Sequence, residues 1–230
     1  MSHNANAKFA FWYLLSLVAL IFMALGAGQV FFQVINKLIV DVPANYAGSF
    51  DTGVLKFAIS SLIISIPLYF ILNCKIERSL EKGELDKESP IRRWLTYAIL
   101  FISSVVMIFW LIYTINNFLD GDLTSKFLLK ALTVIVIAGI AFGYYFYDSR
   151  RDKVRKDDKV LLTFFIVSLV ITVGAFVTAL FFVEKPSEAR AKRIDEQTLN
   201  SFNQLDASIN TYYSQNGKLP SSLAQLSTDT

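Results

Sequence analysis

Residues 160–183 read VLLTFFIVSLVITVGAFVTALFFV, a run without a single Asp, Glu, Lys or Arg. A helix rises about 1.5 Å per residue, so about 20 apolar residues cross the roughly 30 Å hydrocarbon core of a bilayer. This stretch therefore predicts a transmembrane helix. It is typical of the whole chain, in which 54% of 230 residues are hydrophobic and 18% are charged. That balance excludes an ordinary soluble domain.

Four further stretches without charged residues precede it, at 9–36, 57–74, 94–119 and 131–147. The last of these is short, but the long stem of Lys130 can reach the interface, which allows a span from about residue 125. The sequence thus predicts five transmembrane helices. The first run also resembles a signal peptide as far as Gly28, yet its apolar character continues through Phe32, which favours a retained helix.

The basic residues predict an orientation, because Lys and Arg concentrate in cytoplasmic connections. Twelve of them lie between spans two and three or between spans four and five: Lys75, Arg78, Lys82, Lys87, Arg92, Arg93, Arg150, Arg151, Lys153, Arg155, Lys156 and Lys159. The N-terminus is then cytoplasmic and the C-terminus extracytoplasmic. Lys185, Arg190, Lys192 and Arg193 after span five pull the other way, and an even number of spans would reverse the tail.

The first four spans look like two copies of one helical hairpin. Ile35-Asn36-Lys37 matches Ile115-Asn116-Asn117, and Lys56-Phe57 matches Lys126-Phe127. Both hairpins start on the same side, so this pattern indicates a parallel duplication. The alternative is that all membrane hairpins share aromatic and basic ends.

Several motifs of the first four spans carry a likeness to a known family. They are Ile66-Pro67-Leu68-Tyr69-Phe70, Arg92-Arg93-Trp94-Leu95, Phe118-Leu119-Asp120-Gly121-Asp122-Leu123 and Gly143-Tyr144-Tyr145. Together they resemble the bacterial membrane family known as domain of unknown function 5671, over about residues 9–151. The resemblance implies a four-helix membrane domain in bacteria, and we expect the protein in the bacterial cytoplasmic (inner) membrane. It implies no activity and transfers no catalytic residue.

The predicted fold class is all-α: a polytopic membrane protein with two repeated helical hairpins, a fifth helix and a short amphipathic helical tail. The expected parts are a polar N-terminal tail at 1–8, a four-helix transmembrane domain at 9–152, a basic cytoplasmic connection at 153–159, the fifth transmembrane helix at 160–183 and an extracytoplasmic helical tail at 184–230.

No residue pattern points to catalysis, to a cofactor or to a metal. The chain has one Cys and one His, and Cys74 is interpreted as a buried small residue. No ionisable residue lies at mid-span, whereas pumps and ion-coupled transporters normally need one. We therefore expect a protein without enzymatic activity, without cofactors and without a nucleic-acid partner.

Three pairs of small residues, each four apart, predict helix-packing surfaces in the membrane. They are Ala24 with Gly28, Ser61 with Ser65, and Gly139 with Gly143. Only the last is a full GxxxG motif, which serves dimerisation as well as internal packing and so leaves a homo-oligomer open. Pro67 is expected to kink span two.

Polar residues near the predicted helix ends are expected to cap helices or to meet water. The asparagines of this group are Asn36, Asn73, Asn116 and Asn117. Asp120-Gly121-Asp122 predicts a tight turn in which Gly121 takes a positive φ, and either Asp122 or Thr124 caps span four.

The tail predicts an amphipathic helix over about 187–213, ended by Asn216-Gly217, and a short second helix from Pro220 to Leu226. Its apolar face, the predicted interaction surface, consists of Ile194, Leu199, Phe202, Leu205, Ile209, Tyr212 and Tyr213. From Ala191-Lys192-Arg193-Ile194 onward this segment resembles the first helix of pseudopilins and type IV pilins. It departs from them because no processing motif precedes span five and no β-sheet head follows.

Two functional hypotheses result. The first is a membrane scaffold whose tail binds another membrane or envelope protein. The second is a small channel or transporter subunit, which would require a polar cavity lined by Ser60, Ser61, Ser103 and Ser104.

Overall fold

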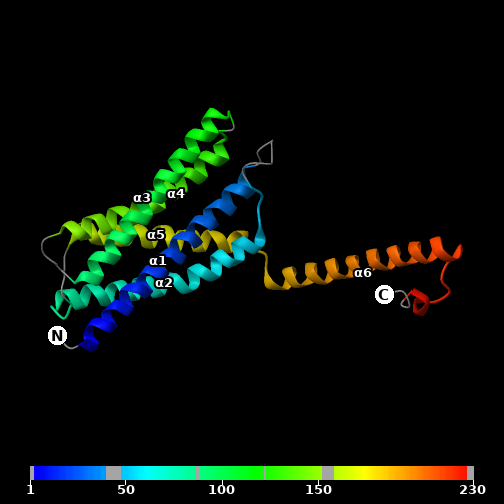
Figure 1. The fold of residues 1–230 in the computed structure, drawn as a ribbon, viewed down its shortest axis with the longest axis horizontal. Helices are drawn as coiled ribbons and strands as arrows, with labels where there is room; N and C mark the ends of the chain where they lie inside the picture. Colours follow the sequence, from blue (N-terminus) through cyan, green and yellow to red (C-terminus); the bar gives the residue numbers. More distant parts are fainter. Residues whose placement is uncertain (1–2, 40–47, 86–88, 122, 152–157, 227–230) are drawn as a thin grey trace. The chain divides into compact units, whose positions relative to one another are not determined.

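The computed structural model describes residues 3–39, 48–85, 89–121, 123–151 and 158–226 (Figure 1). Its helices are α1 (His3–Leu38), α2 (Thr52–Glu81), α3 (Pro90–Leu119), α4 (Ser125–Arg150), α5 (Lys159–Phe182), α6 (Pro186–Asn216) and the 3₁₀ helix η1 (Leu223–Leu226). No strand occurs in these ranges. The chain divides into two compact units, Met1–Val183 and Glu184–Thr230.

Five helices are long and apolar enough to cross a membrane: α1 from Lys8 onward and the whole of α2, α3, α4 and α5. The predicted all-α fold with five spans is therefore confirmed. Most of these helices continue beyond their charge-free runs. The prediction ended span two at Cys74, whereas α2 continues to Glu81. Charged side chains at the end of a span do not end the helix, because their long stems reach the polar interface.

Short polar side chains cap the N-termini of three helices, α2, α4 and α5. Asp51 accepts hydrogen bonds from the backbone amides of Gly53 and Val54, at 2.7 and 3.1 Å, at the start of α2. The Thr124 hydroxyl accepts one from Phe127 and caps α4. Gly121 takes the predicted positive φ, +76°, while Asp122 lies outside the described residues.

The five spans pack as two antiparallel hairpins with α5 beside them. α1 pairs with α2 and α3 with α4, and α5 packs against α1, α2 and α4 (Figure 1). The buried core centres on Val30, Leu55 and Leu62, which have no exposed surface. Ala175 and Ala179 of α5 are also fully buried against this core, because their small side chains let the helix approach closely.

The outer surface of this unit is strongly apolar. On α3 the exposed fractions reach 70% at Phe101, 62% at Phe109 and 74% at Leu119. Soluble monomers rarely expose so much contiguous apolar surface. These faces therefore contact the lipid bilayer.

We predict that Leu62→Ala destabilises the bundle by about 2 kcal/mol or more, because it empties a closed site in the core. Ile64→Ala on the same helix is the matched control, since Ile64 is 67% exposed; it should change stability by less than about 0.5 kcal/mol. Reversible unfolding in mixed micelles, followed by tryptophan fluorescence, measures both. Equal losses would contradict the assignment of the core.

Candidate functional site

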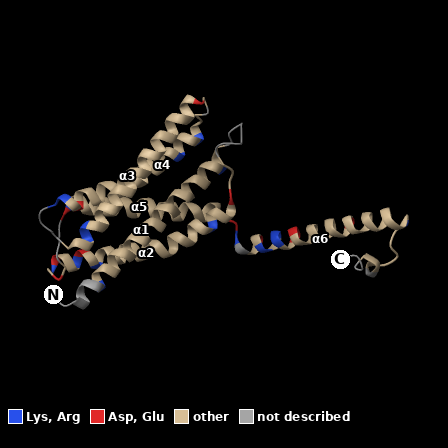
Figure 2. Cartoon of the chain, viewed as in Figure 1, with Lys and Arg blue, Asp and Glu red and all other residues tan. Residues whose placement is uncertain are grey.

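Charged side chains gather at the end of the bundle where α2 and α4 end and α3 and α5 begin, which we call the basic end (Figure 2). Two of its arginines are not at the surface. Arg92 in the first turn of α3 is 6% exposed, and Arg151 directly after α4 is 8% exposed. The basic end thus contains interior charges as well as solvated ones.

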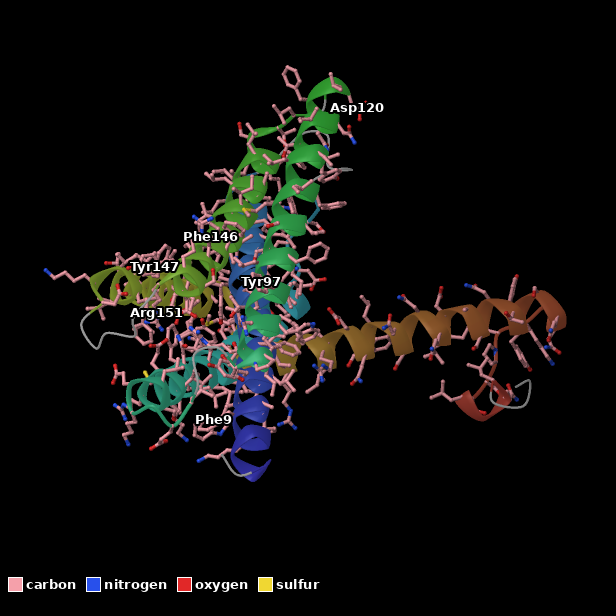
Figure 3. All side chains as sticks on the ribbon, turned by 60° about the vertical axis from the view of Figure 1, so that its left-hand side comes forward. Phe9, Tyr97, Asp120, Phe146, Tyr147 and Arg151 are labelled. Atoms are coloured by element: carbon pink, nitrogen blue, oxygen red, sulfur yellow. The ribbon has the colours of Figure 1, made fainter. Side chains whose placement is uncertain are left out.

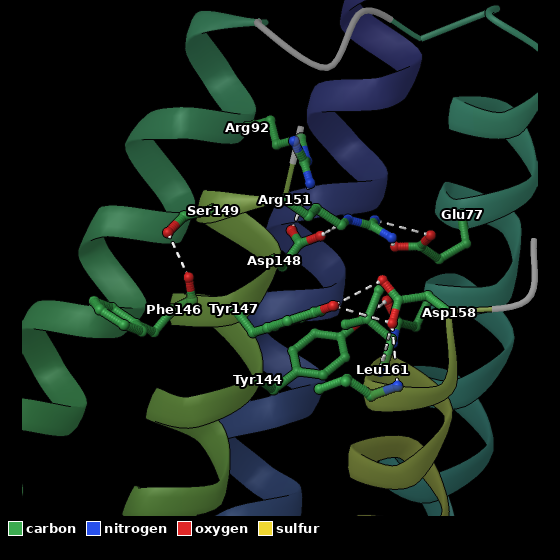
Figure 4. A network of polar contacts seen from close by, with 12 residues as sticks. Glu77, Arg92, Tyr144, Phe146, Tyr147, Asp148, Ser149, Arg151, Asp158 and Leu161 are labelled. Carbon is green, nitrogen blue, oxygen red and sulfur yellow. Dashed lines mark hydrogen bonds and ion pairs between the residues drawn. The ribbon is translucent and has the colours of Figure 1, made fainter. Parts of the chain in front are cut away.

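These arginines alternate with two carboxylates in a chain of ion pairs (Figure 4). An Nη2 atom of Arg92 donates to Oδ2 of Asp148 at 2.5 Å, and Oδ1 of Asp148 lies 2.7 Å from Nε of Arg151. Nη2 of Arg151 donates to both carboxylate oxygens of Glu77, at 2.8 and 3.0 Å. The chain, which we call the four-charge chain, joins α3, α4 and α2 and carries no net charge.

The arrangement is not explained by helix dipoles. Arg92 lies at the positive N-terminal end of α3, and Asp148 lies at the negative C-terminal end of α4. Each charge therefore interacts unfavourably with the dipole of its own helix, at a cost in free energy of roughly 0.3–1 kcal/mol. Because α3 and α4 are antiparallel, these two ends are neighbours, and the two charges neutralise each other. The pair therefore offsets two unfavourable charge placements at the point where the two helix ends meet.

The guanidinium of Arg151 stays charged in this setting. Its burial lowers the pKa, but the neighbouring carboxylates of Asp148 and Glu77 raise it by more, so that the pKa lies above its usual value. Arg151 therefore keeps its charge, and its ion pairs with Asp148 and Glu77, at neutral pH.

A layer of tyrosines lies deeper in the membrane. The Asn73 amide donates to the Tyr144 hydroxyl at 3.0 Å, and the hydroxyls of Tyr69 and Tyr145 lie 3.4 Å apart. The prediction for Asn73 was wrong: it neither caps a helix nor meets water but is buried. The reason is that α2 extends past it, which turns a presumed helix end into a helix interior.

A small cavity opens between the charges and the tyrosine layer. Tyr13 lines it together with Arg92, Asp148 and Glu77. The Tyr13 hydroxyl is buried and has no hydrogen-bond partner among the described residues. The cavity therefore has a polar side, and the apolar part of its wall consists of Leu17, Ile76, Leu80, Leu95 and Ile99.

The connection to α5 is made by a separate contact. The Tyr147 hydroxyl donates to the carboxylate of Asp158, 3.3 Å from each oxygen (Figure 4). Asp158 in turn accepts from the backbone amides of Val160 and Leu161 and so caps α5. One carboxylate thus both starts α5 and fixes it to α4.

The opposite end of the bundle carries fewer charges. Figure 3 shows Asp120 at the tip of the α3–α4 hairpin and Arg151 at its other end. Near this tip, Lys126 is buried and donates to the Gly48 carbonyl at 2.8 Å. Asn36 donates to the Ser49 carbonyl at 2.9 Å, so this asparagine binds the segment that precedes α2.

The predicted packing residues lie in different environments. The Ser61 hydroxyl donates to the Phe22 carbonyl of α1 at 3.0 Å, and Ser65 is buried. A Cβ on Gly143 would lie 3.0 Å from the Phe164 ring, so α5 approaches α4 closely there. A Cβ on Gly139 would meet nothing within 4 Å. Among the described residues, only Gly143 of the GxxxG motif allows the close approach of another helix.

The remaining polar candidates are placed as follows. Asn116 and Asn117 lie in the last turn of α3, and Asn117 donates to the Tyr113 carbonyl at 2.8 Å. Cys74 is exposed on α2, so its interpretation as a buried residue was wrong. No group of three His, Cys, Asp or Glu side chains that could hold a metal ion occurs in the described ranges.

An apolar cleft separates α1 from the α3–α4 hairpin. Its walls are residues Leu17, Leu20, Ile21, Ala24, Leu25, Gly28, Gln29 and Phe32 of α1, Ile99, Ile102, Ser103, Val106 and Trp110 of α3, and Val134, Ile137, Ala138 and Ala141 of α4. Its volume is about 400 Å³. That lies in the lower part of the range of typical small-molecule sites. The small-residue pair Ala24 and Gly28 lines this cleft.

The C-terminal unit consists of α6 and η1. Gly217 ends α6 with a φ of +66°, as predicted, and its amide donates to the Tyr213 carbonyl. Lys192 pairs with Glu184 at the surface near the start of the helix. The predicted short second helix is the 3₁₀ turn Leu223–Leu226. Most of the predicted apolar face is exposed, with Leu199 at 61% and Phe202 at 64%.

Sequence reasoning missed the four-charge chain because it assigned Arg92 and Arg151 only to topology. A signal was available. Glu77 follows Asn73 by four residues and Asp148 follows Tyr144 by four, so each pair shares one helix face. When polar residues on one face of a span continue into charged residues at its end, they indicate a polar network in the interior of the bundle.

The fold and this site define a polytopic helical membrane protein. The chain belongs to the family described as Domain of unknown function (DUF5671), which it matches over residues 10–145. It matches no curated protein and no solved structure. Membership confirms the expected family and agrees with a membrane protein of unknown activity.

We predict that Asp148→Ala destabilises the bundle by about 3–5 kcal/mol, because it leaves two buried guanidinium groups without this carboxylate. Arg92→Met combined with Asp148→Leu should recover most of the loss, since it removes both charges of the α3–α4 pair. Unfolding in mixed micelles measures the effect. Lys192→Met, which breaks the exposed pair of the tail, is the control and should leave the unfolding of the bundle unchanged. If both single variants behave alike, the four-charge chain does not hold the helix ends together.

Proposed function

We propose that this protein is a non-enzymatic membrane scaffold, in which the helical bundle is the anchor and the C-terminal unit binds another membrane or envelope protein. The observation that carries the proposal is the apolar face of α6. Phe202, Leu199 and Tyr213 are each more than half exposed, although this helix is otherwise polar.

The spacing on α6 supports a helical docking surface. Phe202, Leu205, Ile209 and Tyr213 follow one another at intervals of three or four residues, which places them on one face. An amphipathic helix with such anchors is the form in which many helices dock into an apolar groove of a partner. The 3₁₀ turn η1 packs against α6 but leaves Phe202 exposed.

The bundle supports an anchoring role. The buried carboxylate of Asp148 and the half-buried carboxylate of Glu77 are held in ion pairs with arginines, and the tyrosines bond to each other or to Asn73. Groups that are paired in this way hold helices together, whereas a proton relay needs carboxylates that are free to titrate.

We further propose that the protein lies in a bacterial cytoplasmic membrane with its N-terminus inside and its C-terminal unit outside. This rests on the concentration of Lys and Arg at the basic end. Single cysteines test it in a Cys74→Ala background. A membrane-impermeant maleimide added to intact cells should label Asp120→Cys and Lys218→Cys but should spare Lys82→Cys until the cells are opened. If only Lys82→Cys is labelled in intact cells, the orientation is the opposite of the one proposed.

We predict that Phe202→Glu lowers co-purification of the partner by at least about tenfold, because a buried aromatic anchor typically contributes 2 kcal/mol or more. Asn203→Glu adds the same charge on the polar face and should have little effect. Quantitative mass spectrometry after crosslinking in intact cells measures both. If the two variants retain the same set of proteins as the wild type, the apolar face of α6 is not a docking surface.

A second candidate, a channel or transporter subunit, is favoured by the cleft that Ser103 and Gln29 line. The other serines of that hypothesis are used locally: Ser60 and Ser104 donate to backbone carbonyls of their own helices, and Ser61 donates to α1. Ion or solute flux into proteoliposomes that contain only this protein would favour the second candidate.

A further inference from the structure

The cleft between α1 and the α3–α4 hairpin has one polar region in an apolar trough. Its lining is aliphatic from Leu17 to Gly28 of α1 and then includes Gln29 and Trp110. Neither the Gln29 amide nor the indole N–H of Trp110 has a hydrogen-bond partner among the described residues. An unbonded amide is costly inside a bilayer, where no water is available to it.

The depth of this polar region follows from helix geometry. Residues Lys8–Leu38 span about 46 Å, so about 8 Å of helix lies beyond the hydrocarbon core at each end. Gln29 is about nine residues, or about 14 Å, from Leu38 and hence about 6 Å below the boundary. Trp110 is equally far from the end of α3, and its ring contacts Phe32 with centroids 5.8 Å apart. Both donors therefore lie just below the level of lipid ester groups.

The trough below Gln29 has the length of an acyl chain. From Gln29 to Leu17 the helix rises about 18 Å, and because Gln29 lies about 6 Å below the boundary, the trough extends past the midplane of the bilayer. Along this stretch the facing walls are Ile99, Ile102, Val106 and the aliphatic residues of α4. Such a trough matches a single saturated hydrocarbon chain better than it matches a polar solute.

The mouth of the cleft carries positive charge. The Lys130 ammonium lies 5.5 Å from the centre of the Phe32 ring, which lines the cleft. Lys126, one helical turn further toward the tip of the hairpin, is buried and donates to the Gly48 carbonyl, so the charge nearest the cleft is that of Lys130. A cation at this level complements an anionic phosphate above the ester groups.

We propose that the cleft binds one acyl chain of an anionic glycerophospholipid and that the Gln29 amide donates a hydrogen bond to its ester carbonyl. The lipid comes from the leaflet on the side of the α3–α4 tip. It fills the space between α1 and the second hairpin and so completes the bundle laterally. This site is independent of the docking surface on α6.

The hydrogen bond is tested with lipids that lack a carbonyl. The full-length protein is equilibrated with an equal mixture of diester phosphatidylglycerol and its diether analogue, and native mass spectrometry counts the retained lipids. The wild type should retain the diester about three- to tenfold more, the range expected for one neutral hydrogen bond. Gln29→Leu should retain both equally. Ser103→Ala removes another polar group of the same cleft, at a depth without ester groups, and should keep the preference.

The position of the chain is tested separately. Phosphatidylglycerol with a diazirine in its acyl chain should crosslink to the α1 and α4 residues of the cleft. Ala138→Phe fills the cleft and should reduce both crosslinking and lipid retention severalfold. Leu132→Phe, a change on the exposed face of α4, should reduce neither. Melting curves of all variants report on folding.

Three results would overturn the proposal. The first is equal retention of diester and diether lipid by the wild type. The second is crosslinking spread over the exposed face of α3 rather than the cleft. The third is recovery of a different occupant of the cleft, either a second copy of the chain or an amphiphile without an ester.

Discussion

The arrangement of the bundle depends on the ion pair between Arg92 and Asp148. Helix association in a membrane gains little from the hydrophobic effect. The lipid tails that a neighbouring helix displaces are as apolar as the side chains of that helix. Apolar packing alone therefore leaves several registers of α3 against α4 close in free energy. A buried pair of opposite charges reduces this ambiguity, since a slip of one helical turn would break the contact between Arg92 and Asp148.

The other contacts extend what this pair begins. Arg151 carries the connection across to Glu77 of α2, and Asp158 adds α5 through Tyr147. All of these residues lie at one end of the bundle, where water is close enough to reduce the cost of desolvation. The opposite end is held by uncharged acceptors, such as the Gly48 carbonyl that binds Lys126. The two ends are thus held by different interactions, ion pairs at one and hydrogen bonds to carbonyl groups at the other. The region between the α3–α4 hairpin and α1 is less closely packed than either end.

The spans could be predicted from the sequence, whereas the interior site could not. Charge-free runs such as 160–183 are long enough to determine a membrane helix without knowledge of its neighbours. Helix ends were less certain, because a Lys or Arg at the end of a run is compatible with a helix that continues, as α2 does beyond Cys74. The partners of Arg92 and Arg151 depend on which helices adjoin, and that is a property of the tertiary fold. The burial of Asn73 and the exposure of Cys74 could not be predicted for the same reason. When a helix is apolar on every face, its sequence periodicity does not show which side faces the core.

The positions of the four charges along the chain also order the assembly of the protein during synthesis. Arg92 precedes Asp148 by 56 residues, and Glu77 precedes Arg151 by 74. When the first hairpin and α3 have left the ribosome, Glu77 and Arg92 have been synthesised but Asp148 and Arg151 have not. The network closes only when the last turn of α4 follows them. A chain truncated before that point lacks Asp148 and Arg151, the two charged residues through which α3 and α2 are connected at this end of the complete bundle.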